Sequence, residues 1–267
     1  MYQNVVALSS KTHAKKRFTP LRSYGFARNQ GMVPVAAREL SRLAARLPLA
    51  FVTRGETPEP RLVAMLGLDG QSNLLVGPDG RWLSDYVPAA VRRYPFILTQ
   101  PSQADAPPAV AIDTEAGVLS DTEGEPLFTE DGEPTERLNQ AKAILREFTT
   151  GVEATRRATE ALAGAGLLEE WQPTVTVGEK RWRLNGLQSV SEQKLNALDD
   201  ASFAELRREG ALPLAYAQIL STAQLPALVR LANAHAQKAK KGQQSGGNTG
   251  KTNGAGSGGD VSFNFDA

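Results

Sequence analysis

The chain has 267 residues, a formal net charge of +1 and no cysteine. This length suffices for one large or two small domains with a buried core, and the lack of cysteine excludes disulfides, thiolate nucleophiles and cysteine-based zinc sites. The small net charge argues against a dedicated nucleic-acid-binding protein. The charge is nevertheless uneven, since residues 1–60 hold ten Lys and Arg against three acids, whereas residues 105–136 hold ten acids and no base.

The basic N-terminal segment, residues 11–30, interleaves its cations with Phe18, Tyr24 and Phe26. Such a segment is able to bind phosphates and to stack on bases, or it can pair with the acidic stretch of the same chain. The small net charge favours the internal pairing. The first basic residues follow a short apolar stretch, the reverse of a secretory signal. The longest apolar run, residues 62–68, is too short to cross a bilayer, so we expect a cytoplasmic protein that could still associate with the envelope.

The first half of the chain predicts short helices and strands joined by turns. Residues 33–53 and 87–99 each open with Val-Pro-x-Ala, typical of a helix start, and continue through a second proline, which ends the helix, into a short apolar strand. Between them, the runs 61–68 and 72–76 predict a hairpin that turns at Asp69-Gly70. Pro78-Asp79-Gly80 predicts the next turn.

The second half of the chain predicts longer elements. The acidic stretch, residues 113–134, is interrupted by Gly and Pro and predicts consecutive turns ahead of a helix. Apolar residues at helical spacing from Leu138 to Leu162, including Ile144, predict one long helix that ends near Gly164 and Gly166. A hairpin turning at Gly178-Glu179 follows, and then a series of short helices to His235. This irregular alternation predicts an α+β fold with one body over residues 1–237.

Residues 238–267 predict a disordered tail, because they are rich in Gly, Ser and Asn and hold few large apolar side chains. The stretch "SGGNTGKT" (245–252) is similar to a phosphate-binding loop, but Ser245 stands where that motif needs glycine, and no strand–loop–helix context is expected around it. At the tip, Val261, Phe263 and Phe265 alternate with polar residues. This alternation predicts a tip that either docks, as a strand on the edge of a partner's sheet, or stays mobile.

A search for catalytic or metal-binding patterns gives few candidates. The two histidines, His13 and His235, have no companion ligands at metal-site spacing and are expected to be solvated, and no metal or cofactor is expected. The acidic loop breaks the order of an EF-hand. The remaining chemical candidates are carboxylates that could form an acid/base pair acting on a peptide or a sugar. They are Asp113, Glu115, Asp121 and Glu123.

Taken together, six segments resemble the SapC family of bacterial proteins, in the order found in that family and over roughly residues 18–232. They are "VPVAARE" (33–39), "VAMLGLDGQSNLLVGPDGRW" (63–82), "YVPAAVRRYPFIL" (86–98), "GEPLFTEDGEPT" (124–135), "LNGL" (184–187) and "EGALPLAYAQILS" (209–221). The resemblance implies a link to the cell envelope and to surface-layer systems, and members are often encoded beside TonB-dependent outer-membrane receptors. The peptide-transporter permease that shares the short name is a different, membrane-spanning protein.

Two functions from different classes follow from these patterns. The first is a non-enzymatic accessory or binding protein serving envelope, surface-layer or TonB-dependent uptake functions, with an envelope or receptor-operon protein as its partner and no nucleic acid. Its binding surface is predicted at Arg92, Arg93 and Tyr94, where two cations and an aromatic ring meet at a helix end, although these side chains could equally lie over the core. The alternative is an enzyme that uses the carboxylates named above.

Overall fold

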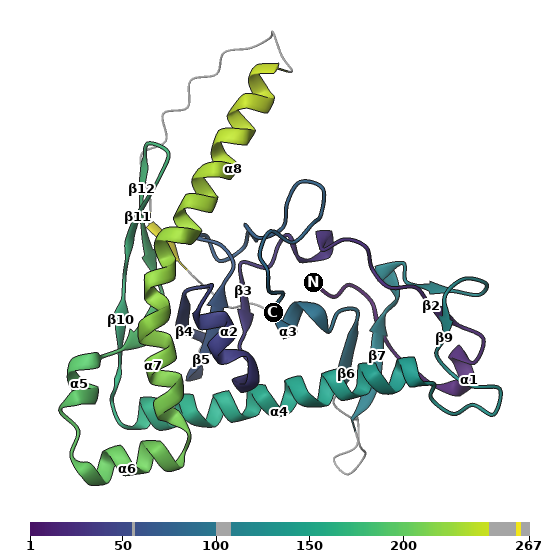
Figure 1. The fold of residues 1–267 in the computed structure, drawn as a ribbon, viewed down its shortest axis with the longest axis horizontal. Helices are drawn as coiled ribbons and strands as arrows, with labels where there is room; N and C mark the ends of the chain where they lie inside the picture. Colours follow the sequence, from purple (N-terminus) through teal and green to yellow (C-terminus); the bar gives the residue numbers. More distant parts are fainter. Residues whose placement is uncertain (55–56, 100–107, 246–259, 263–267) are drawn as a thin grey trace. The chain divides into compact units, whose positions relative to one another are not determined.

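The computed structural model describes residues 1–54, 57–99, 108–245 and 260–262. Its mixture of helices and mostly antiparallel sheets confirms the predicted α+β class (Figure 1). The chain divides into two compact units: unit 1 comprises Met1–Ala27 and Val76–Gly151, and unit 2 comprises Arg28–Leu75 and Val152–Ala267. The sequence predicts one body over residues 1–237. The division is not marked in the sequence because each unit is assembled from two separate segments.

Unit 1 contains two small antiparallel sheets, in which β7 lies between β1 and β6, and β2 lies between β8 and β9. The strands are β1 (Val5–Ala7), β2 (Arg17–Phe18), β6 (Phe96–Thr99), β7 (Ala109–Asp113), β8 (Leu119–Ser120) and β9 (Glu125–Pro126). The short helices are α1 (Ser10–His13), η1 (Gly25–Ala27), α3 (Ala89–Arg92) and η3 (Thr114–Ala116). The core between these elements includes Phe18, Phe96, Ile112 and Leu127.

The basic N-terminal segment pairs with the acidic stretch of its own chain, as the sequence predicts. Strand β2 hydrogen-bonds on one side to β8 and on the other to β9, both from the acidic stretch. The Arg17 side chain donates from Nε to the Gly124 carbonyl at 2.8 Å, and Lys16 Nζ lies 2.8 Å from Asp121 Oδ1. Gly124 has a φ of 100°, and a Cβ there would lie 2.4 Å from the Phe18 carbonyl oxygen. Only glycine therefore fits this turn beside β2.

Unit 2 is built on a five-stranded antiparallel sheet in the order β10-β13-β4-β5-β3. Its strands are β3 (Met32–Pro34), β4 (Leu49–Arg54), β5 (Thr57–Met65), β10 (Leu168–Trp171) and β13 (Leu187–Val190). The helices are η2 (Ala37–Glu39), α2 (Leu40–Ala44), α5 (Glu192–Asn196), α6 (Asp200–Arg208), α7 (Ala211–Ser221), η4 (Thr222–Gln224) and α8 (Leu225–Ser245).

Helix α7 is fixed to this sheet by two polar side chains that are fully buried. Gln218 accepts the Val190 N–H at 2.8 Å and donates to the Leu49 carbonyl at 3.1 Å, while Ser221 Oγ accepts the Leu49 N–H at 2.9 Å. Gln218 and Ser221 are both 0% exposed. Buried polar groups need such partners because an unpaired one costs about 1–3 kcal/mol, so these bonds specify how α7 lies against β4 and β13.

The predicted hairpins are confirmed in one case and wrong in the other. Strands β11 (Thr174–Val177) and β12 (Lys180–Asn185) form the hairpin at Gly178-Glu179. In the earlier segment the turn at Asp69 forms, since its carboxylate accepts the N–H groups of Gln71 and Ser72. The run 72–76 is nevertheless not a strand, apart from a bridge between Val76 and Trp82. Strand β5 instead pairs with β4 and β3.

Both predicted helix-to-strand segments are confirmed, as η2–α2 followed by β4 and as α3 followed by β6. Their prolines do not play the same part. Pro88 is the N-cap of α3, whereas Pro34 belongs to β3 and lies ahead of η2. A proline has no N–H to donate, so it can occupy either a helix start or the end of a strand.

The long predicted helix is α4 (Glu136–Gly164), which begins in unit 1 and ends in unit 2. In its unit 1 half Leu138, Leu145 and Phe148 are buried, and in its unit 2 half Leu162 is buried. Ile144, which belongs to the same helical spacing, is not buried with them, since its side chain is 42% exposed. It lies beside the buried stripe rather than in it, a distinction of one helical position that spacing alone does not resolve.

The predicted start of the tail at residue 238 falls inside α8, which continues to Ser245. Asn233 connects α8 to the neighbouring hairpin by accepting the Gly178 N–H at 2.7 Å and donating to the Thr176 carbonyl at 3.2 Å. Strand β14 (Asp260–Ser262) runs parallel to β12, with Val261 opposite Leu184. The tip of the tail thus adds a strand to a sheet of its own unit, whereas the sequence predicts a partner's sheet. Phe263, Phe265 and residues 246–252 of the loop-like motif lie outside the described residues.

Within the described residues, one helical stretch, Ala211–Lys238, is long and apolar enough to cross a membrane by length and composition. A third of its most apolar window (33%) is buried within the protein. The longest uninterrupted apolar run in the sequence does not show this stretch, because polar residues such as Gln218, Ser221, Thr222 and Arg230 divide it. Core helices of proteins outside membranes meet the same criteria, so the stretch is weak evidence for a membrane span.

Candidate functional site

The four candidate carboxylates do not meet in a cleft within the described residues. Glu115, Asp121 and Glu123 are exposed, and Asp121 forms the ion pair with Lys16 described above. Only Asp113 is buried, at 0% exposure. None of the four lines either of the two cavities described below, and an acid/base pair for sugar or peptide hydrolysis needs two carboxyls on either side of a bound substrate. The geometry therefore gives the enzymatic alternative no support.

Asp113 is a structural carboxylate that holds the N-terminal residues of the chain against unit 1. Its Oδ1 accepts the N–H groups of Asn4 at 3.0 Å and Glu115 at 3.2 Å, and its Oδ2 accepts the Gln3 N–H at 2.9 Å and the Tyr94 hydroxyl at 3.0 Å. Burial alone raises the pKa of Asp113, but these four hydrogen bonds to the charged form outweigh it and hold the pKa below its ordinary value. All its acceptor capacity is used within the fold.

The histidine expectation is wrong for His13, which is buried at 7% exposure. Ser9 caps α1, and the short helix turns the His13 ring inward, where Nδ1 lies 2.8 Å from Thr12 Oγ1. His235 is half-buried on α8. Among the described residues, no group of three or more His, Asp or Glu side chains is placed to hold a metal ion.

The predicted binding residues Arg92, Arg93 and Tyr94 have three different environments. Arg92 is exposed, and its Nε donates to the Val87 carbonyl at 2.9 Å. Tyr94 is 9% exposed, with its ring stacked on Phe26 at a centroid distance of 4.1 Å. Burial raises the pKa of the Tyr94 hydroxyl, and its hydrogen bond to Asp113 raises the pKa further, so Tyr94 is a neutral core residue. Arg93 is the partly buried member of the set.

Arg93 lies among aromatic rings rather than carboxylates. Its guanidinium carbon is 4.6 Å from the centroid of the Phe148 ring and 5.6 Å from that of Tyr2. Burial lowers the pKa of Arg93, which Tyr2 partly offsets, and burial raises the pKa of Tyr2 to about 12. The Nε atom of Arg93 is buried without a hydrogen-bond partner among the described residues.

A second arginine, Arg137 on α4, has the same kind of environment. Its guanidinium carbon lies 4.7 Å from the centroid of the Phe18 ring, and its Nε is also buried without a partner. Within the described residues, no hydrogen bond or ion pair to a carboxylate satisfies either guanidinium. An arginine keeps its charge at any physiological pH, and a buried charge without a counterion is costly. Contact with ring faces offsets only about 0.5–2 kcal/mol of this cost.

Both arginines line one cavity of about 90 Å³ in unit 1, which we call the arginine pocket. It is lined by Phe18, Arg92, Arg93, Tyr94, Phe96, Arg137, Gln140, Ala141 and Ile144. Its volume is enough for a few water molecules or one small anionic group. Exposed lining residues, among them Ile144 at 42%, leave it accessible to solvent. The structure thus unites the predicted Arg92, Arg93 and Tyr94 with residues of α4.

The contribution of α4 to this pocket is missing from the sequence-based prediction. Arg137, Gln140, Ala141 and Ile144 stand at helical spacing, so one face of the predicted helix carries a cation, an amide and two apolar groups. That pattern is visible in the sequence. The fact that this face meets the α3–β6 segment is not, because these elements are about 45 residues apart in the chain.

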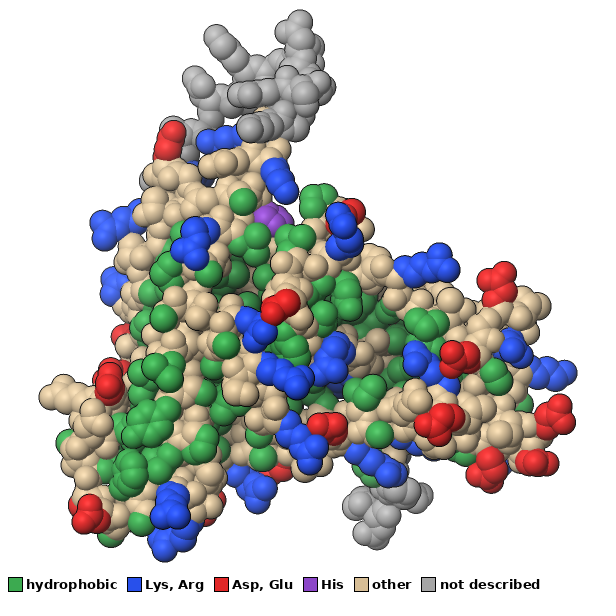
Figure 2. Space-filling model, in the orientation of Figure 1, with side chains coloured by type: hydrophobic (Ala, Val, Ile, Leu, Met, Phe, Trp, Pro, Cys, Tyr) green, Lys and Arg blue, Asp and Glu red, His purple; other side chains and the backbone are tan. Residues whose placement is uncertain are grey.

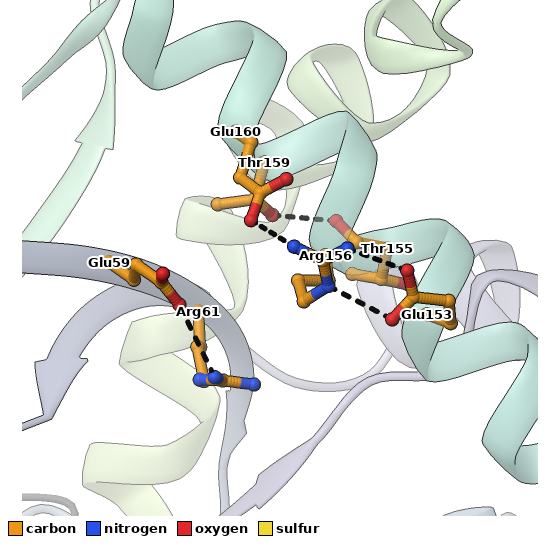
Figure 3. Close-up of polar contacts among 7 residues, drawn as sticks. All are labelled: Glu59, Arg61, Glu153, Thr155, Arg156, Thr159 and Glu160. Carbon is orange, nitrogen blue, oxygen red and sulfur yellow. Dashed lines mark hydrogen bonds and ion pairs between the residues drawn. The ribbon is translucent and has the colours of Figure 1, made fainter. Parts of the chain in front are cut away.

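A larger cavity of about 480 Å³ in unit 2 is lined by α4 and α6 and has a different character. Two of its three glutamates already have partners: Glu160 pairs with Arg156, and Glu205 pairs with Arg208. Figure 3 shows Arg156 between Glu153 and Glu160 on α4, with Nη2 2.7 Å from Glu153 Oε1. Two of the acidic side chains of this cavity are therefore already paired with arginines of the same unit, which leaves less reason for a cationic ligand.

Unit 2 also carries an exposed apolar face. On the side drawn in Figure 2, hydrophobic side chains gather over α6 and α7. Phe203 on α6 is 36% exposed, and Tyr216 and Leu220 on α7 are 43% and 71% exposed. Large apolar side chains that gather on a surface mark contact sites more often than scattered ones do.

The fold and the pocket define an α+β protein of two units with a cationic, aromatic-walled pocket and no recognised catalytic arrangement in its described part. A family model described as SapC matches residues 8–228. The chain therefore belongs to the SapC family, as the six sequence segments indicate. No match was found among curated proteins or among solved structures.

Proposed function

We propose that this protein is a non-enzymatic accessory protein that binds a partner of the bacterial cell envelope, in a surface-layer or TonB-dependent uptake system. The observation that carries the proposal is the arginine pocket, where the partly buried Arg93 and Arg137 have no counterion among the described residues and the Nε of each is buried without a hydrogen-bond partner. A pocket of this kind suits recognition of an anionic group on another molecule. The envelope context comes from membership of the SapC family.

Two further features support binding rather than catalysis. The carboxylates available for acid/base work are exposed or, for Asp113, fully hydrogen-bonded within the fold. The apolar face of α6 and α7 provides a surface of the type used in protein contacts. A partner could be anchored through an anionic group in the pocket and through apolar contacts elsewhere.

Affinity capture from a SapC-encoding bacterium tests this function. We compare the wild-type protein with a double variant, R93Q/R137Q, which keeps polar side chains of similar length but removes both charges. R146Q serves as the matched control, since Arg146 is an exposed cation on the same helix that does not line the pocket. We expect an envelope or receptor-operon protein to be recovered with wild type and R146Q, and at least tenfold less with R93Q/R137Q.

The proposal fails if no envelope protein is recovered and a deletion strain grows like wild type on complex peptides and glycans. Equal recovery by the folded double variant would show that the arginine pocket is not the binding site. Circular dichroism and the melting temperature of each variant establish that it is folded before capture.

A further inference from the structure

The arginine pocket contains cations but no acid among its lining residues. Arg92, Arg93 and Arg137 contribute three positive charges. Two carboxylates hydrogen-bond to lining residues from outside the pocket: Asp113 accepts from the Tyr94 hydroxyl at 3.0 Å, and Glu136 accepts from the Gln140 side chain at 3.2 Å and thereby restrains the amide of the pocket. The electrostatic character of the cavity is therefore that of an anion site.

The walls of the pocket restrict which anions fit. Besides its cations and Gln140, it is lined by Phe18, Phe96, Ala141 and Ile144, together with the buried Tyr94. A phosphate on a sugar would bring hydroxyls against these apolar walls, where they would lose hydrogen bonds to water without replacement. A carboxylate on an apolar stem presents a planar anion to the guanidinium groups and a hydrocarbon to the rings.

We infer that the arginine pocket binds a carboxylate carried on an apolar stem, such as the carboxyl end of a chain that finishes in an apolar residue. This inference rests on the proposed binding function and specifies its ligand. The guanidinium fork matches the two oxygens of a carboxylate. Arg93 and Arg137 come from different elements, α3–β6 and α4, so a single carboxylate can receive donors from both sides of the cavity.

The small volume adds a size limit. About 90 Å³ accommodates the carboxylate and little more, so the stem lies at the mouth. There the Ile144 side chain, 42% exposed, provides apolar surface for it. Ligands with the same carboxylate but a polar stem should therefore bind more weakly than those with an apolar stem.

Titrations of the full chain with small probes test this inference. The probes are isovalerate and phenylacetate, their neutral amides as uncharged controls, and inorganic phosphate. Binding is followed through the NMR signals of arginine Nε–H groups, since the buried Nε–H groups of Arg93 and Arg137 report on the pocket itself. We expect both carboxylates to shift these two signals saturably, with at least tenfold weaker binding of the amides and of phosphate.

The variants separate the contributions of charge and shape. R93Q and R137Q should each weaken carboxylate binding about tenfold, which corresponds to the loss of one charge-assisted contact. R137K keeps the charge but loses the planar fork, and should bind more weakly than wild type. R146Q should bind as wild type does.

The outcomes of this experiment and of the capture experiment are distinguishable. If phosphate binds as tightly as the carboxylates, or if no carboxylate shifts the two signals, the inference is overturned, even if partner capture still depends on the arginines. If the carboxylates bind and their binding depends on Arg93 and Arg137, the inference holds. It then holds even where capture yields no envelope protein and the proposed function fails.

Discussion

The two halves of helix α4 use arginine in opposite ways. In the unit 2 half, Arg156 lies between Glu153 and Glu160, three residues before it and four after it, and pairs with both (Figure 3). In the unit 1 half, Arg137 lies over the Phe18 ring and pairs with no acid of the described chain. Both are the same residue type on one continuous helix, so the difference lies in what surrounds them.

This difference separates a structural arginine from one available to a ligand. Glu153 raises the pKa of Arg156 by accepting a hydrogen bond from it, and Glu160 acts in the same direction, so this cation is satisfied within the helix. Arg93 shows the reverse, since burial lowers its pKa. An arginine that the fold itself does not satisfy lowers stability. Such a cost is common where residues serve binding.

The largest expected effect on the free energy of unfolding comes from replacing Asp113, a fully buried carboxylate of unit 1. The carboxylate accepts hydrogen bonds from three N–H groups and the Tyr94 hydroxyl, and it forms no direct ion pair with the arginines of the pocket within the described residues. In D113N, if the side-chain oxygen stays at the position of Oδ1, the new NH2 group replaces Oδ2. It then faces the Gln3 N–H, so two hydrogen-bond donors oppose each other. We expect a loss of about 3 kcal/mol in the free energy of unfolding at pH 7, measured by urea denaturation.

The pH dependence of this effect has a defined sign. Because the folded pKa of Asp113 is lowered, its contribution is fully present above the unfolded pKa of about 3.9 and is lost as the pH falls through the folded value. The stabilities of wild type and D113N should therefore converge below about pH 4. E115Q is the control, because Glu115 is exposed and its replacement should change little. A constant difference between wild type and D113N at all pH values would contradict this assignment.

The second prediction concerns the unpaired arginine directly. In R137M the charge is removed, while the methionine side chain still fills space and contacts the Phe18 ring. We expect the loss of the cation–π contact to be smaller than the relief of an unpaired, partly buried charge, so the unfolding free energy should rise by about 1 kcal/mol. Thermal unfolding of the ligand-free protein measures it. A clear fall in melting temperature would instead identify Arg137 as a structural arginine held by the ring.

These contrasts also show how much could be predicted from the sequence. Local signals were sufficient for α4, for the β11–β12 hairpin and for the α3–β6 segment with Arg92, Arg93 and Tyr94, because capping, turn and spacing rules act over a few residues. They also predicted the internal pairing of the basic N-terminal segment. The helix, the hairpin and the α3–β6 segment are encoded within short stretches of sequence. The internal pairing follows from the strong difference in charge between residues 1–60 and residues 105–136.

The rest depends on contacts between distant segments. Arg137 completes the arginine pocket only because α4 packs beside the α3–β6 segment in unit 1. Strand β5 pairs with β4 and β3 rather than with the run 72–76, although both partners lie before it in the chain and the run follows it closely. Strand β14 lies along β12 of its own unit, and no local pattern distinguishes that edge from the edge of a partner's sheet.

The smallest expected effect on stability comes from replacing Arg156, and its dependence on salt distinguishes Arg156 from Arg137. Its ion pairs lie at the surface, with the side chain 34% exposed, and such pairs contribute little to stability. We expect R156Q to lower the melting temperature slightly at low salt, and the difference to vanish in 1 M NaCl, where screening acts within about 3 Å. The gain in R137M should persist in 1 M NaCl, because it comes from relief of the desolvation cost of a partly buried guanidinium, and salt does not screen that cost. If both effects disappear at high salt, the guanidinium of Arg137 is exposed to solvent ions in the same way as that of Arg156, and the distinction between the two halves of α4 fails.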